Sequence, residues 1–235
     1  MKLEKITNQS QASRRRYEDA CGTAHALELI GERWALLVMR ELMLGPKRFS
    51  DIRADLPGIS ANVLTQRLEG LEVSGLVTRR KLPPPASVQV YELTEWGYEA
   101  EPFIQHMGRW ATRSPLHDPS RPLSGTSLML SFRTMFDPAR AGDLKAALGF
   151  QLGHETFLVR IGDGRLTAER GDPAEAQVVF TGTPPAVAGV VYGGAPIEAL
   201  EAEGALSVEG DRKLAARFAT LFPLPPKVGA TDSSA

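Results

Sequence analysis

A polar face on one predicted helix carries side chains that can read DNA bases. The helix spans residues 61–73, and Ser60 precedes it as an N-cap whose hydroxyl can accept a backbone N–H. Its buried face is made of leucines at helical spacing: Leu64, Leu68 and Leu71. The opposite face carries Asn62, Thr65 and Gln66, short donors and acceptors suited to base edges in a major groove.

A basic run follows that helix. Arg79, Arg80 and Lys81 lie on the first of two β-branched runs, residues 75–82 and 88–94, which flank a proline-rich turn. Alone, the run is typical of a solvated strand edge, but its place directly after the candidate recognition helix favours phosphate contacts. Three further cations complete the DNA-binding candidates: Lys47, Arg48 and Arg67. Arg67 flanks the leucine stripe and could reach a phosphate or tie the helix to a neighbouring acid.

The surrounding pattern predicts the elements that position these groups. Apolar residues at three- and four-residue spacing predict one long helix over residues 24–43, and Ser50 is expected to cap a short helix over residues 51–56. With the 61–73 helix these form a helix-turn-helix, although any helical hairpin would share the pattern. The basic hairpin that follows completes the order of a winged helix.

A further helix begins near Glu95. An apolar stripe of four side chains runs along it: Trp96, Phe103, Met107 and Trp110. So small a domain offers this stripe no partner of its own, so we expect a dimer interface to bury it.

The motifs of residues 21–97 resemble the HxlR-type winged helix-turn-helix regulators. They read C-x4-A-L-x-L-I-G-x-R-W, then G-P-x-R-F-S-D-I, L-P-G-I-S-x-N-V-L-T-Q-R-L and Y-x-L-T-x-x-G, and the helix to about Arg113 fits the same family. The resemblance implies a homodimer joined through the N-terminal helix and the helix after the wing, bound to pseudo-palindromic double-stranded operator DNA. This chain has Gly22 where family members commonly have proline, which loosens the start of that helix.

Cys21 is a candidate redox sensor, because some members of that family sense oxidants or electrophiles at the matching cysteine. Such chemistry needs a lowered thiol pKa near a cation or a helix N-terminus. Arg14, Arg15 and Arg16 are near in sequence, but sequence proximity fixes no distance. A packed, unreactive thiol is the alternative.

Composition narrows the classes of protein. The 235 residues are 43% hydrophobic and 23% charged, with a net charge of −1, so any nucleic-acid contact must come from a local patch. The apolar runs are too short to cross a membrane and no secretory signal is present, so we expect a cytoplasmic protein without membrane insertion. One cysteine and four scattered histidines predict no metal site. No catalytic spacing is present, so we expect neither an enzyme nor a cofactor.

A proline- and serine-rich stretch divides the chain. We predict a DNA-binding and dimerisation domain over residues 1–113, a linker over 114–125, a second domain over 126–224 and a flexible tail over 225–235. The second domain is predicted to be an α+β layer domain: a helix from Phe136 to about Leu148, an antiparallel meander over residues 155–181, and helices around a strand at 206–209. The whole chain is therefore expected to be α+β.

The second domain resembles the sterol carrier protein type two domain. The resemblance covers about residues 130–224, chiefly through G-D-G-R-L at 162–166 and L-S-V-E-G-D at 206–211. It implies an apolar tunnel for a lipid or another hydrophobic molecule. Eight apolar residues are candidates to line it, although ordinary core packing would explain them equally: Phe157, Phe180, Val187, Val190, Val191, Leu200, Phe218 and Phe222.

Three functions compete. The first is a transcriptional regulator whose second half binds a hydrophobic small-molecule effector. The second is a lipid carrier that uses the winged half only to dimerise. The third is a redox switch at Cys21 with the second half as a scaffold.

Overall fold

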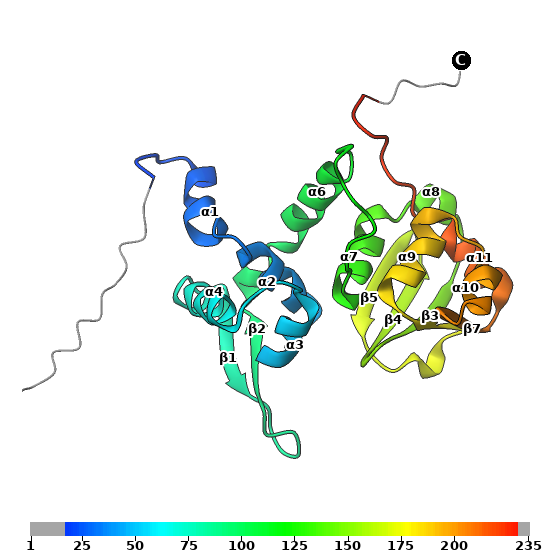
Figure 1. Cartoon of the computed structure of the whole chain (residues 1–235), viewed down its shortest axis with the longest axis horizontal. Coiled ribbons are helices and arrows are strands. Elements are labelled where there is room, and N and C mark those ends of the chain that lie inside the picture. Colours follow the sequence, from blue (N-terminus) through cyan, green and yellow to red (C-terminus); the bar gives the residue numbers. More distant parts are fainter. Residues whose placement is uncertain (1–16, 230–235) are drawn as a thin grey trace, which may run out of the picture.

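The chain folds into two lobes of mixed helix and sheet, as the expected α+β class requires (Figure 1). The computed structural model describes residues 17–229. The first lobe holds helices and a two-stranded hairpin, and the second holds a five-stranded sheet with helices. Within residues 17–229, no helix is both long enough and apolar enough to cross a membrane.

The first lobe has the predicted winged helix-turn-helix order. Its elements are α1 (Gly22–Ile30), α2 (Ala35–Leu42), α3 (Phe49–Asp55), α4 (Ala61–Val73), β1 (Val77–Lys81), β2 (Gln89–Leu93), α5 (Glu95–Tyr98) and α6 (Glu101–Ala111). The strands of the hairpin pair antiparallel, with Val77 opposite Leu93 and Lys81 opposite Gln89.

Two predicted boundaries in this lobe are wrong. The long helix over residues 24–43 is broken into α1 and α2, because Trp34 adopts a left-handed backbone with φ of 78°. At the break, a Cβ on Gly31 would lie 2.3 Å from the Leu27 carbonyl oxygen, so a side chain does not fit there. The short helix α3 begins before Ser50, with Arg48 at the N-cap position, and the Ser50 hydroxyl donates to Asp51 instead.

Helix α4 is positioned as predicted. The Ser60 hydroxyl accepts the Val63 N–H at 3.2 Å, and Leu64, Leu68 and Leu71 are buried. They pack in the first-lobe core with residues of α2 such as Val38. A capped N-terminus and a buried leucine face fix which side of α4 points outward.

The second lobe is built on one sheet of strand order β5-β4-β3-β6-β7. Its elements are α7 (Gly125–Met135), α8 (Pro138–Ala141), β3 (Ala146–Leu152), β4 (Glu155–Gly162), β5 (Arg165–Arg170), η1 (Pro173–Glu175), β6 (Val178–Gly182), α9 (Pro184–Gly193), α10 (Ile197–Ala202), β7 (Leu206–Gly210) and α11 (Arg212–Ala219). The helices after β6, the final strand and the hairpin of β4 with β5 agree with the sequence prediction.

The start of the second lobe differs from the prediction. The sequence predicts no helix directly after the linker, yet α7 begins at Gly125. The helix predicted to reach Leu148 ends at Ala141, and β3 replaces its last part. In β3, Leu148, Phe150 and Leu152 alternate inward, and pairing with β4 and β6 makes it the central strand. The predicted meander is also wrong beyond β5, because β6 runs parallel to β3.

Aromatic rings fill the second core. Phe132 of α7, Phe150 of β3, Phe180 of β6 and Phe218 of α11 are fully buried. Phe150 stacks on Phe180 at 5.1 Å between ring centroids, and Phe132 meets Phe218 edge-on at 5.2 Å. Contacts of this kind tie α7, the sheet and α11 into one core.

Candidate nucleic-acid interface

The exposed face of α4 is the polar face expected from the sequence. Asn62, Thr65 and Gln66 lie outside the buried leucine face, and Asn62 and Thr65 are exposed. Ser60 is exposed as well, with its hydroxyl engaged at the helix N-terminus. The three outward groups therefore stand on a rigid helix, where their donors and acceptors can meet base edges.

The basic hairpin lies next to α4 (Figure 1). Arg79 and Arg80 have side chains 50% and 43% exposed, and Lys81 is exposed too. Arg79 lies 3.8 Å from Glu72, and Arg80 is paired with Glu92, whose hydrogen bond raises the pKa of that guanidinium. Exposed pairs of this type are weak enough for phosphates to replace the carboxylates.

Two other cations lie at the borders of this surface. Arg48 stands at the N-cap position of α3, where its side chain has no capping hydrogen bond. Arg67 is directed towards the segment between α1 and α2, where its Nε donates to the Arg33 carbonyl at 2.9 Å and its Nη2 lies 3.0 Å from Glu32. The second of the two roles considered for Arg67, a tie to a neighbouring acid, is the one that this structure displays.

Lys47 does not lie on this surface, which corrects its place among the DNA-binding candidates. The residue is only 4% exposed, and its ammonium contacts Glu41, Asp55 and Glu155. A phosphate cannot reach a cation that is enclosed by three carboxylates. The sequence could not reveal this, because Glu155 lies in the other half of the chain.

The first lobe also has an exposed apolar face, which is formed by α5 and α6. Trp96 on α5 is 49% exposed, and Phe103, Met107 and Trp110 on α6 are 45%, 43% and 74% exposed. Trp96 and Phe103 also line a hollow against Leu29 and Ile30 of α1. The predicted stripe is thus exposed, and it continues onto the N-terminal helix.

Cys21 is an exposed thiol at the start of α1. Hydrogen bonds from the backbone and side chain of Thr23, and from the Ala24 backbone, lower its pKa. The helix N-terminus thus supplies the condition that a reactive thiolate needs. The neighbouring arginines considered for this role, Arg14 to Arg16, lie outside the described residues.

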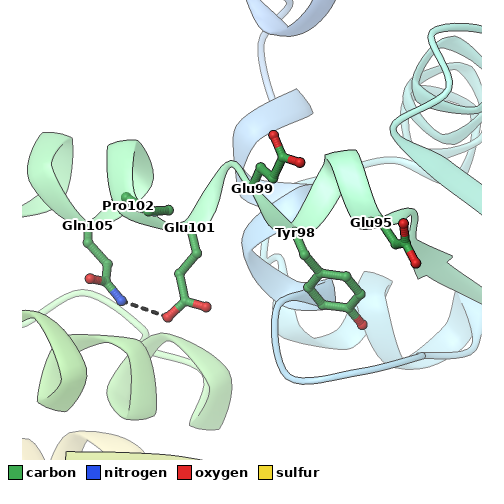
Figure 2. Close-up of a pocket in the computed structure, with 6 residues that line it drawn as sticks. All are labelled: Glu95, Tyr98, Glu99, Glu101, Pro102 and Gln105. Carbon is green, nitrogen blue, oxygen red and sulfur yellow. Dashed lines mark hydrogen bonds between the residues drawn. The ribbon is translucent and has the colours of Figure 1, made fainter. Parts of the chain in front are cut away.

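A shallow hollow lies where α5 meets α6 (Figure 2). Its residues are Glu95, Tyr98, Glu99, Glu101, Pro102 and Gln105. Glu101 accepts from Gln105 at 2.7 Å and from Arg133 of α7 at 2.7 Å, so this carboxylate holds the two lobes together. Burial raises the pKa of the Tyr98 phenol, which keeps it protonated. The hollow is thus lined by first-lobe residues, of which Glu101 also contacts α7.

The eight tunnel candidates all belong to the second core or pack against it. Phe157, Phe180, Val187 and Phe218 are fully buried, and Leu200 is partly buried against the same cluster. Phe218 also contacts Phe222 at 4.7 Å between ring centroids. Ordinary core packing accounts for these residues. Among residues 17–229, no group of three or more His, Cys, Asp or Glu side chains could hold a metal ion.

Comparison with known proteins matches the two lobes separately. Residues 29–117 match the family model described as HxlR-like helix-turn-helix. The HTH-type transcriptional regulator YodB of Bacillus subtilis is 41% identical over 86 residues, which cover 37% of this chain and 77% of that protein. The regulator YvaP of the same species is 37% identical over 87 residues, which cover 37% of this chain and 81% of the relative.

The second lobe matches a different family from the one that the sequence resembled. Residues 121–227 match the alkyl sulfatase C-terminal model, to which the predicted sterol carrier-like domain is only loosely related. The sec-alkylsulfatase Pisa1 from Pseudomonas sp. is similar in structure, with 19% identity, coverage of 45% of this chain and 17% of that chain, and a TM-score of 0.40. The role of the second lobe must therefore be argued from its own residues.

Proposed function

Because the chain belongs to the HxlR-type family of helix-turn-helix transcriptional regulators, we propose that it binds a pseudo-palindromic operator as a homodimer. Helix α4 enters the major groove, and the hairpin of β1 and β2 follows the phosphates. The observation that carries this proposal is the outward face of α4, with Asn62, Thr65 and Gln66 beside three exposed cations of the wing.

A binding titration tests this proposal. Full-length protein is titrated into labelled duplexes from the region upstream of its own gene, with a scrambled duplex as competitor. Two-fold symmetry requires half-sites about 10 bp apart or a multiple of that spacing. Equal affinity for the upstream and scrambled duplexes would contradict operator recognition and leave the carrier function, with the winged lobe used for dimerisation, as the better account.

Gln66→Ala sharpens the assignment of α4. Removal of a base contact is expected to cost about 1–3 kcal/mol against the preferred base and to relax selectivity there. Glu69→Ala is the matched control, because Glu69 is exposed on the same helix but nearly one turn further from its N-terminus. Unchanged discrimination by Gln66→Ala across all operator variants would remove α4 as the reading element.

We assign the dimer contact to the exposed face of α5 and α6 with α1. A large apolar surface of this kind on a small domain is typical of a protein interface. A two-fold axis would bring the same face of a second copy onto it, since identical subunits pair through one self-complementary patch.

We further propose that the second lobe modulates operator binding in response to a hydrophobic small molecule. This proposal is supported by the way the second lobe packs directly on the helix-turn-helix, through contacts between α7 and α2. The candidate lining residues are buried in its core or pack against it, so a ligand must displace side chains on entry. Native mass spectrometry of the purified protein, followed by operator titration with any molecule found, tests this. A bound hydrophobe that leaves operator affinity unchanged would contradict it.

Cys21 supports a second candidate, a redox-responsive regulator. Its thiol is exposed at the start of α1, and hydrogen bonds from Thr23 and Ala24 lower its pKa, which favours the thiolate form that oxidants attack. Under this candidate, Cys21→Ser retains operator binding and no longer responds to diamide or hydrogen peroxide. An identical oxidant response in wild type and Cys21→Ser would eliminate the candidate.

A further inference from the structure

The two lobes share α7, which lies beside α6 in one lobe and β5 in the other (Figure 1). Leu130 of α7 is part of the first core, whereas Phe132 and its other apolar neighbours belong to the second. Arg133 reaches across to Glu101 of α6 at 2.7 Å. The second lobe is therefore packed onto the helix-turn-helix and is not merely tethered to it.

A buried ion cluster forms the centre of this contact. Lys47 Nζ lies 3.0 Å from Glu41 on α2 and 3.1 Å from Glu155 on β4, and it also pairs with Asp55 at the end of α3. The Ser124 hydroxyl, directly before α7, donates to Glu41 at 2.8 Å. Burial alone would raise the pKa of Glu41, but Arg40, Lys47 and Ser124 together lower it. Each charge thus has a partner, as burial requires.

Arg170 of β5 holds the loop that joins α2 to α3. Its Nη1 donates to the carbonyl oxygens of Leu44 at 2.9 Å and Gly45 at 3.2 Å. Its Nη2 donates to the Thr126 hydroxyl at 3.0 Å, and the guanidinium also pairs with Glu155 at 3.1 Å. One rigid guanidinium thereby fixes the loop to α7 and to the sheet.

The same loop is also bonded to the wing. Lys47 N–H donates to the Tyr91 carbonyl at 3.0 Å, and Tyr91 N–H donates to the Lys47 carbonyl at 2.9 Å. Lys47 thus joins four elements, because its backbone pairs with β2 while its side chain contacts α2, α3 and β4. A shift of this loop would move the wing relative to the recognition helix.

We propose that Lys47 and Arg170 are positioning residues for DNA binding: through them the second lobe fixes the wing and α4 in the geometry that binds the operator. This inference rests on the operator binding proposed above. In this proposal neither Lys47 nor Arg170 contacts DNA. Lys47 is enclosed by carboxylates, and Arg170 belongs to a lobe without a predicted nucleic-acid contact.

Arg170→Met in the full-length protein tests the inference directly. Operator affinity is expected to fall about 5- to 150-fold, the usual range for coupling between distant sites. Affinity for the scrambled duplex and the salt slope should hardly change, because the substitution removes no side chain that contacts a phosphate. Arg160→Met is the matched control, since Arg160 is an arginine of neighbouring β4 whose ion pairs, with Glu169 and Glu175, stay within the second lobe.

Lys47→Met distinguishes a positioning role of Lys47 from the direct DNA contact that the sequence suggested for it. Removal of a phosphate contact would lower the slope of log affinity against log salt by about 0.9. Positioning instead predicts weaker operator binding with the wild-type slope. A lowered slope in Lys47→Met would overturn the inference for this residue.

Hydrogen exchange supplies a readout that needs no DNA. In Arg170→Met the amides of Lys47 and Tyr91 are expected to exchange at least about tenfold faster, while those in the core of β3 keep their protection. Failure of the wild type to recognise an operator would refute the proposed function, whereas this exchange result would still decide whether Arg170 holds the loop.

Arg170→Lys covers the case in which Arg170→Met does not fold. Lysine keeps the charge but lacks the planar fork that donates to the loop, to Thr126 and to Glu155 at once. We expect thermal stability close to that of the wild type, faster exchange at Lys47 and Tyr91, and reduced operator affinity. Wild-type exchange and wild-type operator affinity in Arg170→Lys would overturn the proposal.

Discussion

The two lobes treat their large apolar side chains in opposite ways. The winged lobe leaves Trp96, Phe103, Met107 and Trp110 exposed along one face. In residues 121–227 of the second lobe, all of which the structure describes, Leu224 is the only large apolar side chain that is exposed, at 48%. The first lobe thus has a continuous exposed apolar face, whereas the second lobe buries nearly all of its large apolar side chains.

This difference indicates that the two lobes have different roles. Under the proposed function, the exposed apolar face binds a second subunit and the exposed basic hairpin binds DNA. Under the same proposals, the second lobe, which is bonded to the loop before α3, acts on DNA binding only through the first lobe. The lobes should therefore respond differently when equivalent residues are replaced.

The largest contrast is expected between two aromatic residues. Phe218→Ala removes a fully buried ring that contacts Phe132, Phe150, Phe180 and Phe222, and should lower the free energy of unfolding by about 3–5 kcal/mol. Trp110→Ala should change that free energy by about 0.5 kcal/mol or less in the monomer, since its side chain is 74% exposed. Denaturant unfolding at a concentration where the protein is monomeric measures both. Equal decreases would break the comparison.

The next largest effect is expected on dimer formation. Trp110→Glu places a charge in the face assigned to the second subunit, so the dimer should dissociate at a concentration at least about tenfold higher. Val73→Glu is the control, because Val73 is 82% exposed on α4 and lies outside the stripe. Sedimentation equilibrium compares the two. A dimer of Trp110→Glu as tight as that of Val73→Glu would place the subunit interface elsewhere.

Local signals explain what the sequence predicted correctly. The Ser60 cap and the leucine stripe define α4 within a few residues, and two β-branched runs around a turn define the wing. The outward residues of α4 follow from that stripe alone. Their orientation could thus be predicted without any knowledge of the second lobe.

The errors arise where distant parts of the chain decide the outcome. β3 is central because β4 and β6 pair with it, and its sequence, AALGFQL, carries no turn or cap that distinguishes it from a helix. Lys47 is buried because the second lobe, including Glu155, covers it. Residues 225–229, which lie in the predicted tail, also contact a distant part of the chain: Val228 N–H donates to the Arg113 carbonyl, just after α6, at 2.8 Å.

The smallest predicted change concerns the wing, where exposed cations contrast with the buried Lys47. Replacing Arg79, Arg80 and Lys81 together with alanine should lower the salt slope by about 0.9 for each phosphate contact that the replacement removes, and weaken specific and scrambled duplexes alike. Stability should hardly change, because the pairs of Arg79 and Arg80 are exposed. The control removes three exposed cations from the second lobe, Lys145, Arg160 and Arg165, and should retain the wild-type slope.

If both triple variants kept the wild-type slope, the wing would not lie along the phosphates. If both lowered it equally, the second lobe would also contact DNA, and the contrast between an open first lobe and a closed second lobe would fail.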